Sequence, residues 1–239
     1  MGAYQKWADQ VGDDSFTFQN LLPYFEKSVN FTPPNLSKLK LSKGENITYD
    51  SKVFKFQGGP LHVSYSNYRL AFTKFVINAL NTLGVSSIPG LNSGSLIGQA
   101  TFAFTIDPAD ETRSSSETSF LQSAIQAKLG IQVYTRTSAK QIIIDKDSKT
   151  ATGVMVKTDG LEYLLTAKKE VIVAAGAFKT PQLLMVSGVG PSEILDSLNI
   201  PVLSDLKGIG QNMWVCNSVV GDCLLLIANL GSSPGPLTV

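Results

Sequence analysis

An apolar run that leads into a glycine turn and a short helix, within residues 171–190, constrains the fold of this chain most strongly. Its first five residues are all apolar, and such a run without alternation is typical of a strand buried on both faces in a parallel sheet. Gly176 ends the run, and Thr180 and Pro181 suit a helix N-cap and first helical position. Residues 187–191 then stop the helix. The pattern predicts a strand–turn–helix unit of an α/β core.

A glycine turn between a strand and a helix is also a place where backbone N–H groups meet anionic ligands, because the first amides of a helix have no partner within it. Turn glycines of this kind are common, however. On pattern alone, an ordinary core unit without a ligand is the simpler interpretation.

Composition narrows the class of protein. The chain has 239 residues, enough for one large or two small domains, and a net charge of +1 gives no electrostatic case for nucleic acid or an acidic membrane. No apolar run approaches the roughly 20 residues that a membrane helix needs. Two cysteines, Cys216 and Cys223, suit neither a disulfide framework nor a zinc site. We therefore expect no nucleic acid, no membrane span and no metal.

Periodicity and turn residues predict the remaining elements. A capping-box pattern at Ser114 and Glu117 predicts one helix start, and Asp159-Gly160 predicts a hairpin turn. The sole histidine, His62, lies in a strand pattern without a local acid partner, which favours a structural role. The expected helices are two within 1–28, then 67–83, 117–129 and 192–199; the expected strands are 60–65, 100–106, 132–135, 141–145, 151–157 and 161–165, with a long loop at 29–58.

Four segments, in order along the chain, resemble one family. Residues 176–190 are similar to the second signature of the glucose–methanol–choline oxidoreductases, which are flavoenzymes that oxidise alcohols with FAD. Residues 208–214, 113–121 and 7–25 resemble further blocks of that family. The resemblance runs from about residue 4 to residue 214, and aryl-alcohol oxidases and related dehydrogenases look nearest.

The resemblance implies an α/β fold, α+β in part: a partial FAD-binding Rossmann-like domain with a β-meander, plus part of a substrate-binding domain. Residues 1–58 would be the N-terminal helices and loop of the FAD domain, and 59–115 a partial substrate-binding domain. Residues 116–214 would hold the FAD-domain helix, the meander and the signature strand–helix. Residues 215–239 would be a divergent tail.

The resemblance also implies cofactor positions. Ala139 occupies the place where the family contacts the adenine side of FAD through its backbone, and Ala175 and Gly176 correspond to the turn that approaches the cofactor. The expected cofactor is FAD and the expected substrate is a small-molecule alcohol.

Some family features are not found. The pyrophosphate loop G-x-G-x-x-G is not present, and nothing matches the family's catalytic histidine pair. We therefore expect no catalytic residue in this chain, and an internal fragment of a longer protein that is inactive alone. A non-catalytic truncated paralogue that acts through binding is the alternative. Three glycosylation sequons, at Asn30, Asn35 and Asn46, are consistent with secretion of the full-length protein, although residues 1–7 do not form a signal peptide.

Overall fold

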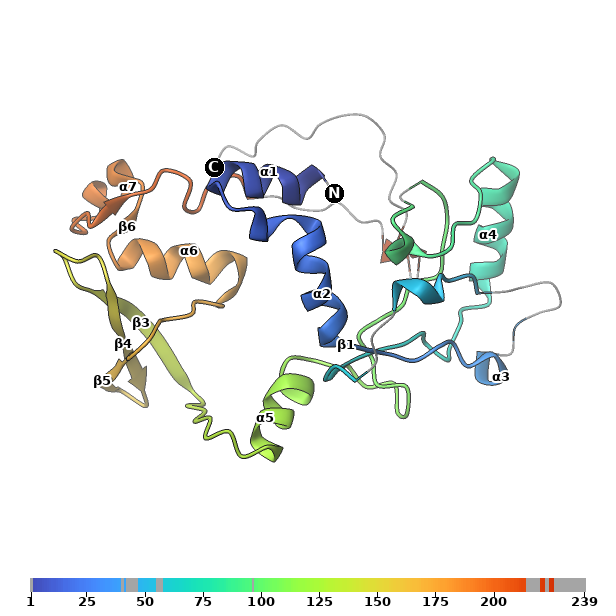
Figure 1. The fold of residues 1–239 in the computed structure, drawn as a ribbon, viewed down its shortest axis with the longest axis horizontal. Helices are drawn as coiled ribbons and strands as arrows, with labels where there is room; N and C mark the ends of the chain where they lie inside the picture. Colours follow the sequence, from blue (N-terminus) through green and yellow to red (C-terminus); the bar gives the residue numbers. More distant parts are fainter. Residues whose placement is uncertain are drawn as a thin grey trace. The chain divides into compact units, whose positions relative to one another are not determined.

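The computed structural model describes residues 2–39, 41, 47–54, 58–95, 97–213, 220–221 and 224–225. The chain divides into two compact units. The N-terminal unit comprises Met1–Ile131 with Ser218–Asn229, and the meander unit comprises Gln132–Asn217 with Leu230–Val239. Both contain helices and strands, which confirms the mixed fold class (Figure 1).

The N-terminal unit begins with two helices, as predicted. Helix α1 (Gly2–Val11) ends at Gly12, which has a φ of +68°, and a 3-10 turn, η1 (Asp14–Phe16), leads into α2 (Phe18–Ser28). The turn is stabilised by Asp13, whose carboxylate accepts a hydrogen bond of 2.8 Å from the Ser15 amide.

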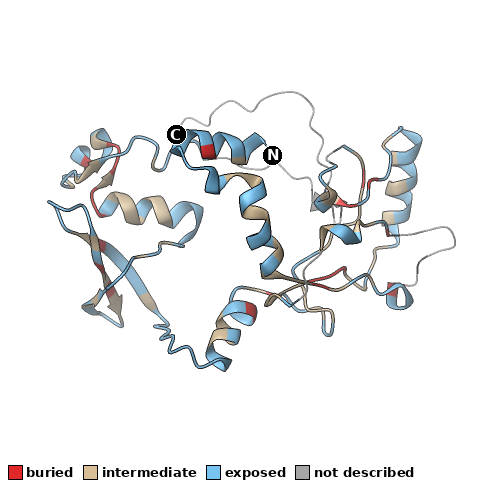
Figure 2. Ribbon diagram, viewed as in Figure 1, coloured by how far each residue is buried: buried red, intermediate tan, exposed pale blue. Residues whose placement is uncertain are grey.

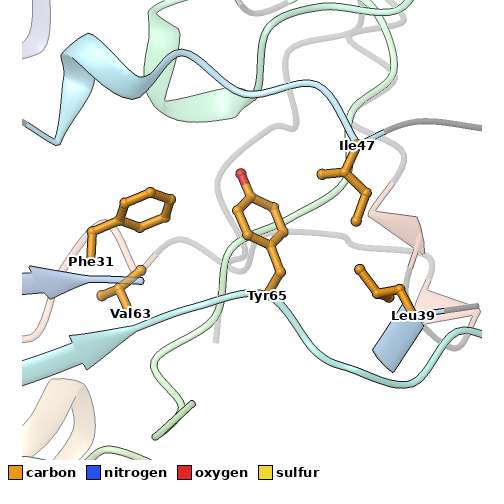
Figure 3. Close-up of a cluster of buried hydrophobic side chains, with 5 residues drawn as sticks. All are labelled: Phe31, Leu39, Ile47, Val63 and Tyr65. Carbon is orange, nitrogen blue, oxygen red and sulfur yellow. The ribbon is translucent and has the colours of Figure 1, made fainter. Parts of the chain in front are cut away.

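The core of the N-terminal unit forms around a short parallel strand pair. Strand β1 (Val29–Phe31) pairs with β2 (Leu61–Val63), so part of the expected loop at 29–58 is a strand. That stretch also contains α3 (Leu36–Leu39) and the 3-10 turn η2 (Ser51–Val53). The buried cluster consists of Phe31, Leu39, Ile47, Val63 and Tyr65 (Figure 3).

Two predictions in this unit need correction. Helix α4 (Phe72–Thr82) begins five residues after the predicted start at Asn67, whose amide donates instead to the Glu111 carboxylate at 2.9 Å. The predicted strand at 100–106 is wrong, since it makes only the isolated bridges of Phe104 with Ser64 and of Ile106 with Arg113. A 3-10 turn, η3 (Leu91–Ser93), lies between these segments.

The helix predicted at 117–129 is a π-helix, η4 (Glu117–Leu121), continued by α5 (Gln122–Gln126). Its capping pair is shifted from the predicted Ser114 and Glu117. The amide of Ser115 donates to the Thr118 hydroxyl at 2.9 Å, and the Thr118 amide donates to the Ser115 hydroxyl at 3.2 Å. Ser114 instead accepts from the His62 amide at 3.1 Å, so it ties the segment to β2.

Strands β8 (Val220–Gly221) and β9 (Leu224–Leu225) form an antiparallel pair.

The meander unit is built on three antiparallel strands in the order β3 (Thr137–Ile144), β4 (Ala151–Thr158) and β5 (Leu161–Thr166). The hairpin turn predicted at Asp159-Gly160 is confirmed: both residues have positive φ, +48° and +91°, as a type I′ turn requires. The strand predicted at 132–135 is wrong, because this stretch lies before β3 and pairs with no described strand.

Helix α6 (Gly176–Val186) follows the meander and is succeeded by β6 (Val189–Gly190), α7 (Ser192–Ser197) and β7 (Ser204–Asp205). Strands β6 and β7 pair in parallel. The predicted helix at 192–199 is confirmed, and its Leu195 side chain is fully buried. Ile194 and Leu198 of this segment are exposed.

The buried parallel strand expected at residues 171–175 is not formed. The segment has no strand structure, and Ile172 is 79% exposed. Figure 2 shows that buried residues are few throughout the two units. A strand of this composition is buried only between parallel neighbours. The described strands of the meander unit are an antiparallel meander and one two-residue parallel pair, and they do not provide those neighbours. None of the helices in the described residues is long and apolar enough to span a membrane.

Candidate functional site

The N-terminus of α6 contains two of the three residues predicted to contact a cofactor. Ala175 is the N-cap, and Gly176 begins the helix with a φ of +85°. Among the residues that the structure describes, no side chain caps the first amides of α6. A methyl group placed on Gly176 would meet no described atom within 4 Å, so the approach to the helix end is open.

Thr180 does not act as the predicted N-cap, because α6 begins five residues earlier than expected. Its hydroxyl lies within the helix and accepts a hydrogen bond of 3.1 Å from the Ala175 amide. The bond satisfies the amide directly in front of the helix and holds the turn in place. Pro181 is likewise in the helix interior, where it lacks the N–H that would bond one turn back.

The α6 N-terminus fits an anionic part of FAD. Free N–H groups and the positive end of the helix dipole both favour negative charge, and α6 has eleven residues. A glycine at the first position lets a ligand approach the backbone without meeting a side chain. The residues present therefore fit a phosphate group of the expected cofactor.

The third predicted residue, Ala139, lies in β3, opposite Val156 of β4. It is exposed, and the strand register shifts between Ala139 and Gln141. Because β3 is an edge strand of the meander, its outer backbone groups are not used by the sheet at this position. An exposed edge next to a bulge suits the backbone contact expected with an adenine.

Ser187 connects the two elements that carry the predicted residues. Its hydroxyl accepts a hydrogen bond of 2.8 Å from the Ile142 amide of β3 and donates one of 2.6 Å to the Leu183 carbonyl of α6. Ser187 is only 2% exposed. The structure thus brings the elements carrying Ala139, Ala175 and Gly176 into contact within one unit. Ser187 is not recognisable from the sequence, because a serine before a helix-ending glycine gives no signal of a distant partner.

The glycines that follow α6 serve packing. Gly188 has a φ of +86°, and a methyl group there would lie 2.6 Å from the Pro201 carbonyl oxygen. A methyl group on Gly190 would lie 2.8 Å from Cγ of Met185. A methyl group on Gly210, in the family-like block 208–214, would lie 3.4 Å from Cε of Met185. These glycines therefore allow the segment after α6 to fold back against it.

His62 lies in a strand, as predicted, and its expected structural role stays a prediction. It lies half-buried in β2, in register with Asn30 of β1, and its amide is held by Ser114. In the part of the chain that the structure describes, no three His, Cys, Asp or Glu residues are grouped so that they could hold a metal ion. Cys216, Cys223 and Trp214 lie outside the described residues.

Comparison with known proteins identifies the family. The family profile described as GMC oxidoreductase matches residues 2–216. This chain belongs to the GMC oxidoreductases. A glucose methanol choline oxidoreductase of Aspergillus terreus is 48% identical over 213 residues, which are 89% of this chain and 34% of the relative. The patulin synthase of Aspergillus clavatus is 44% identical over 213 residues, 88% of this chain and 33% of the relative.

Solved structures agree with this assignment and with the predicted FAD-domain fold. An FAD-dependent oxidoreductase from Chaetomium thermophilum matches with a TM-score of 0.74 and 31% identity, over 87% of this GMC chain and 35% of the other. A fungal aryl-alcohol oxidase matches with a TM-score of 0.75 and 25% identity, over 82% and 32%. The chain spans about a third of the length of the relatives it matches. The cofactor contacts of Ala139, Ala175 and Gly176 stay a prediction.

Proposed function

We propose that this GMC chain is part of an FAD-dependent oxidoreductase that acts on the CH–OH group of a small-molecule alcohol. The observation that carries the proposal is the family match over residues 2–216 together with an open, uncapped helix N-terminus at the family's signature turn. Structural neighbours named as an FAD-dependent oxidoreductase and an aryl-alcohol oxidase support the same class.

In this proposal the meander unit holds part of the cofactor. The first amides of α6, opened by Gly176, donate to a phosphate group, and the edge of β3 at Ala139 contacts the adenine side. Ser187 joins β3 to the C-terminal end of α6, so both proposed contacts belong to one unit. FAD supplies the acceptor for the hydride that leaves the alcohol carbon.

The proposed domain assignment gives residues 59–115 to substrate binding. A pocket of ≈ 90 Å³ lies in the N-terminal unit, and most of its lining comes from this range. Phe102, Phe104 and Ile77 supply an apolar wall, while Arg69 and Gln99 supply polar groups. The pocket combines these apolar side chains with several hydroxyl groups, and such a mixed lining would suit a small organic alcohol. Residues 1–58 and 116–214 are assigned to the FAD domain, and 215–239 to a divergent tail.

The experiment that tests the class is a flavin measurement on the full-length protein that contains this chain, purified from its native host, because the chain alone is expected to be inactive. We expect a flavin absorbance band that bleaches anaerobically when an aryl alcohol is added, because hydride transfer reduces the ring. Protein without flavin, or with a band that no alcohol bleaches, would favour the alternative of a non-catalytic binding protein.

A matched pair of variants tests the cofactor position. Gly176 and Gly130 both have positive φ, +85° and +71°, and both have open space where a methyl group would go. Alanine at either position therefore carries a similar backbone strain of about 1–2 kcal/mol. We expect Gly176→Ala to weaken FAD binding about tenfold, or about 1.4 kcal/mol, while Gly130→Ala leaves it unchanged. Equal affinities in the two variants would exclude Gly176 from the cofactor site.

A further inference from the structure

The three glycosylation sequons differ in their structural settings. Asn30 and Asn35 are described by the structure, whereas Asn46 lies outside the described residues. A folded protein accommodates a glycan only where the asparagine side chain lies on the surface, because the attached sugar is bulky and hydrophilic. Exposure and hydrogen bonding therefore separate the two described sites.

Asn35 lies on the surface at a well-anchored position. Asn35 and Ser37 are exposed, whereas Leu39, two residues further on, is part of the buried core cluster. The anchor holds the sequon outward at a defined place on the N-terminal unit. A glycan attached there would extend into solvent without displacing the core.

The hydrogen bonds of the Asn35 side chain leave its nitrogen available. Its Oδ1 accepts a hydrogen bond of 2.7 Å from the Ser37 hydroxyl and one of 3.2 Å from the Lys38 amide. Both bonds use the oxygen, whereas a sugar is attached to Nδ2. Modification therefore preserves both bonds, and the hydroxyl that defines the sequon already contacts the side chain to be modified.

Asn30 has the opposite setting. It is half-buried in the middle of β1, directly before the core residue Phe31, and pairs in register with His62 of β2. The backbone pairing continues beyond it, since the Thr32 amide donates to the Val63 carbonyl at 2.9 Å. A glycan at Asn30 would have to fit beside a paired strand.

We propose that Asn35 is an N-glycosylation site of this protein and that Asn30 is not, so that the protein passes through the secretory pathway. In the transfer, a bond forms between Nδ2 of Asn35 and the anomeric carbon of a lipid-linked oligosaccharide. The bond from that carbon to the donor's pyrophosphate oxygen breaks, and the lipid pyrophosphate leaves. The transferase takes the proton released from the amide, and nothing is oxidised or reduced. The modification is independent of flavin binding.

Glycopeptide mapping of the protein from its native host tests the proposal. Peptides are compared by mass spectrometry before and after endoglycosidase H, which leaves a single N-acetylglucosamine as a mass tag. We expect the tag on the Asn35 peptide, its complete loss in Asn35→Asp and Ser37→Ala, and its retention in Ser37→Thr. Asn30→Gln, the matched sequon control, should leave the tag on the Asn35 peptide unchanged.

Asn35→Asp also controls for folding, because an aspartate oxygen accepts the same two hydrogen bonds but offers no amide nitrogen. The unfolding midpoint of Asn35→Asp should equal that of the enzymatically deglycosylated wild type. This variant therefore tests the proposal even if Ser37→Ala does not accumulate. An unmodified Asn35 peptide in the native protein would overturn the proposal. A glycan on Asn30 in the folded protein would overturn the structural distinction between the sites.

Discussion

Replacing Ser187 by alanine removes the hydroxyl that joins β3 to α6. In the wild type this group accepts from the Ile142 amide at 2.8 Å and donates to the Leu183 carbonyl at 2.6 Å. Ile142 is 4% exposed and Ser187 is 2% exposed, so water does not readily replace the lost oxygen. The variant therefore leaves the Ile142 N–H buried without its partner.

The loss of stability in Ser187→Ala follows from these two hydrogen bonds. Leaving a buried donor unsatisfied destabilises a protein by about 1–3 kcal/mol. The bond to the Leu183 carbonyl adds little, because a hydroxyl that bonds back onto its own helix contributes weakly. We therefore expect a loss of about 1–3 kcal/mol, which corresponds to a roughly 5- to 150-fold change in the opening equilibrium of the meander unit.

Native-state hydrogen exchange measures this change within one unit, which avoids assuming that the two units unfold together. The Ile142 amide and its neighbours in β3 should exchange faster by that factor. Ser197→Ala is the matched control, because the Ser197 hydroxyl also bonds a helix carbonyl, of Ile194 at 2.8 Å, but lies exposed. Ser197→Ala should change the opening free energy derived from exchange by less than about 0.5 kcal/mol. Equal exchange in the two variants would refute a structural role for the Ser187 link.

Two further predictions concern stability. Gly188→Ala should destabilise the meander unit more than Gly176→Ala in urea unfolding. Both variants share the strain of a positive φ, but only the methyl group at Gly188 meets the Pro201 carbonyl oxygen, at 2.6 Å. Similar unfolding midpoints for the two variants would contradict this. Burial, with a smaller contribution from Tyr49, raises the pKa of Tyr65 from 10.0 to about 12, so the folded state favours neutral Tyr65. Its contribution to the free energy of unfolding is complete below pH 10 and is lost as the pH rises towards about 12; a Tyr65→Phe variant should remove this part of the alkaline loss, and an unchanged alkaline profile would contradict the assignment.

Local patterns in the sequence located most of the regular structure. The helices within 1–28, the last three meander strands and the Asp159-Gly160 turn follow from periodicity and turn chemistry, which act over a few neighbouring residues. The predicted positions of the helix starts are less accurate. The helix starts predicted at Asn67, Ser114 and Thr180 are all displaced. The hydroxyls of Ser114 and Thr180 accept from the His62 and Ala175 amides, because a side chain that can cap a helix can equally bond another amide.

The order of family-like segments was enough to identify the family and the expected FAD-domain fold, because signature residues are arranged by local turns that the sequence contains in full. The environment of residues 171–175 was not predictable in this way. An apolar run reports what a segment is able to bury, whereas burial itself depends on neighbouring strands, which a local pattern does not contain. The same holds for Ser187 and for the contrast between Asn30 and Asn35. Each depends on a partner or a surface that only packing between distant segments provides.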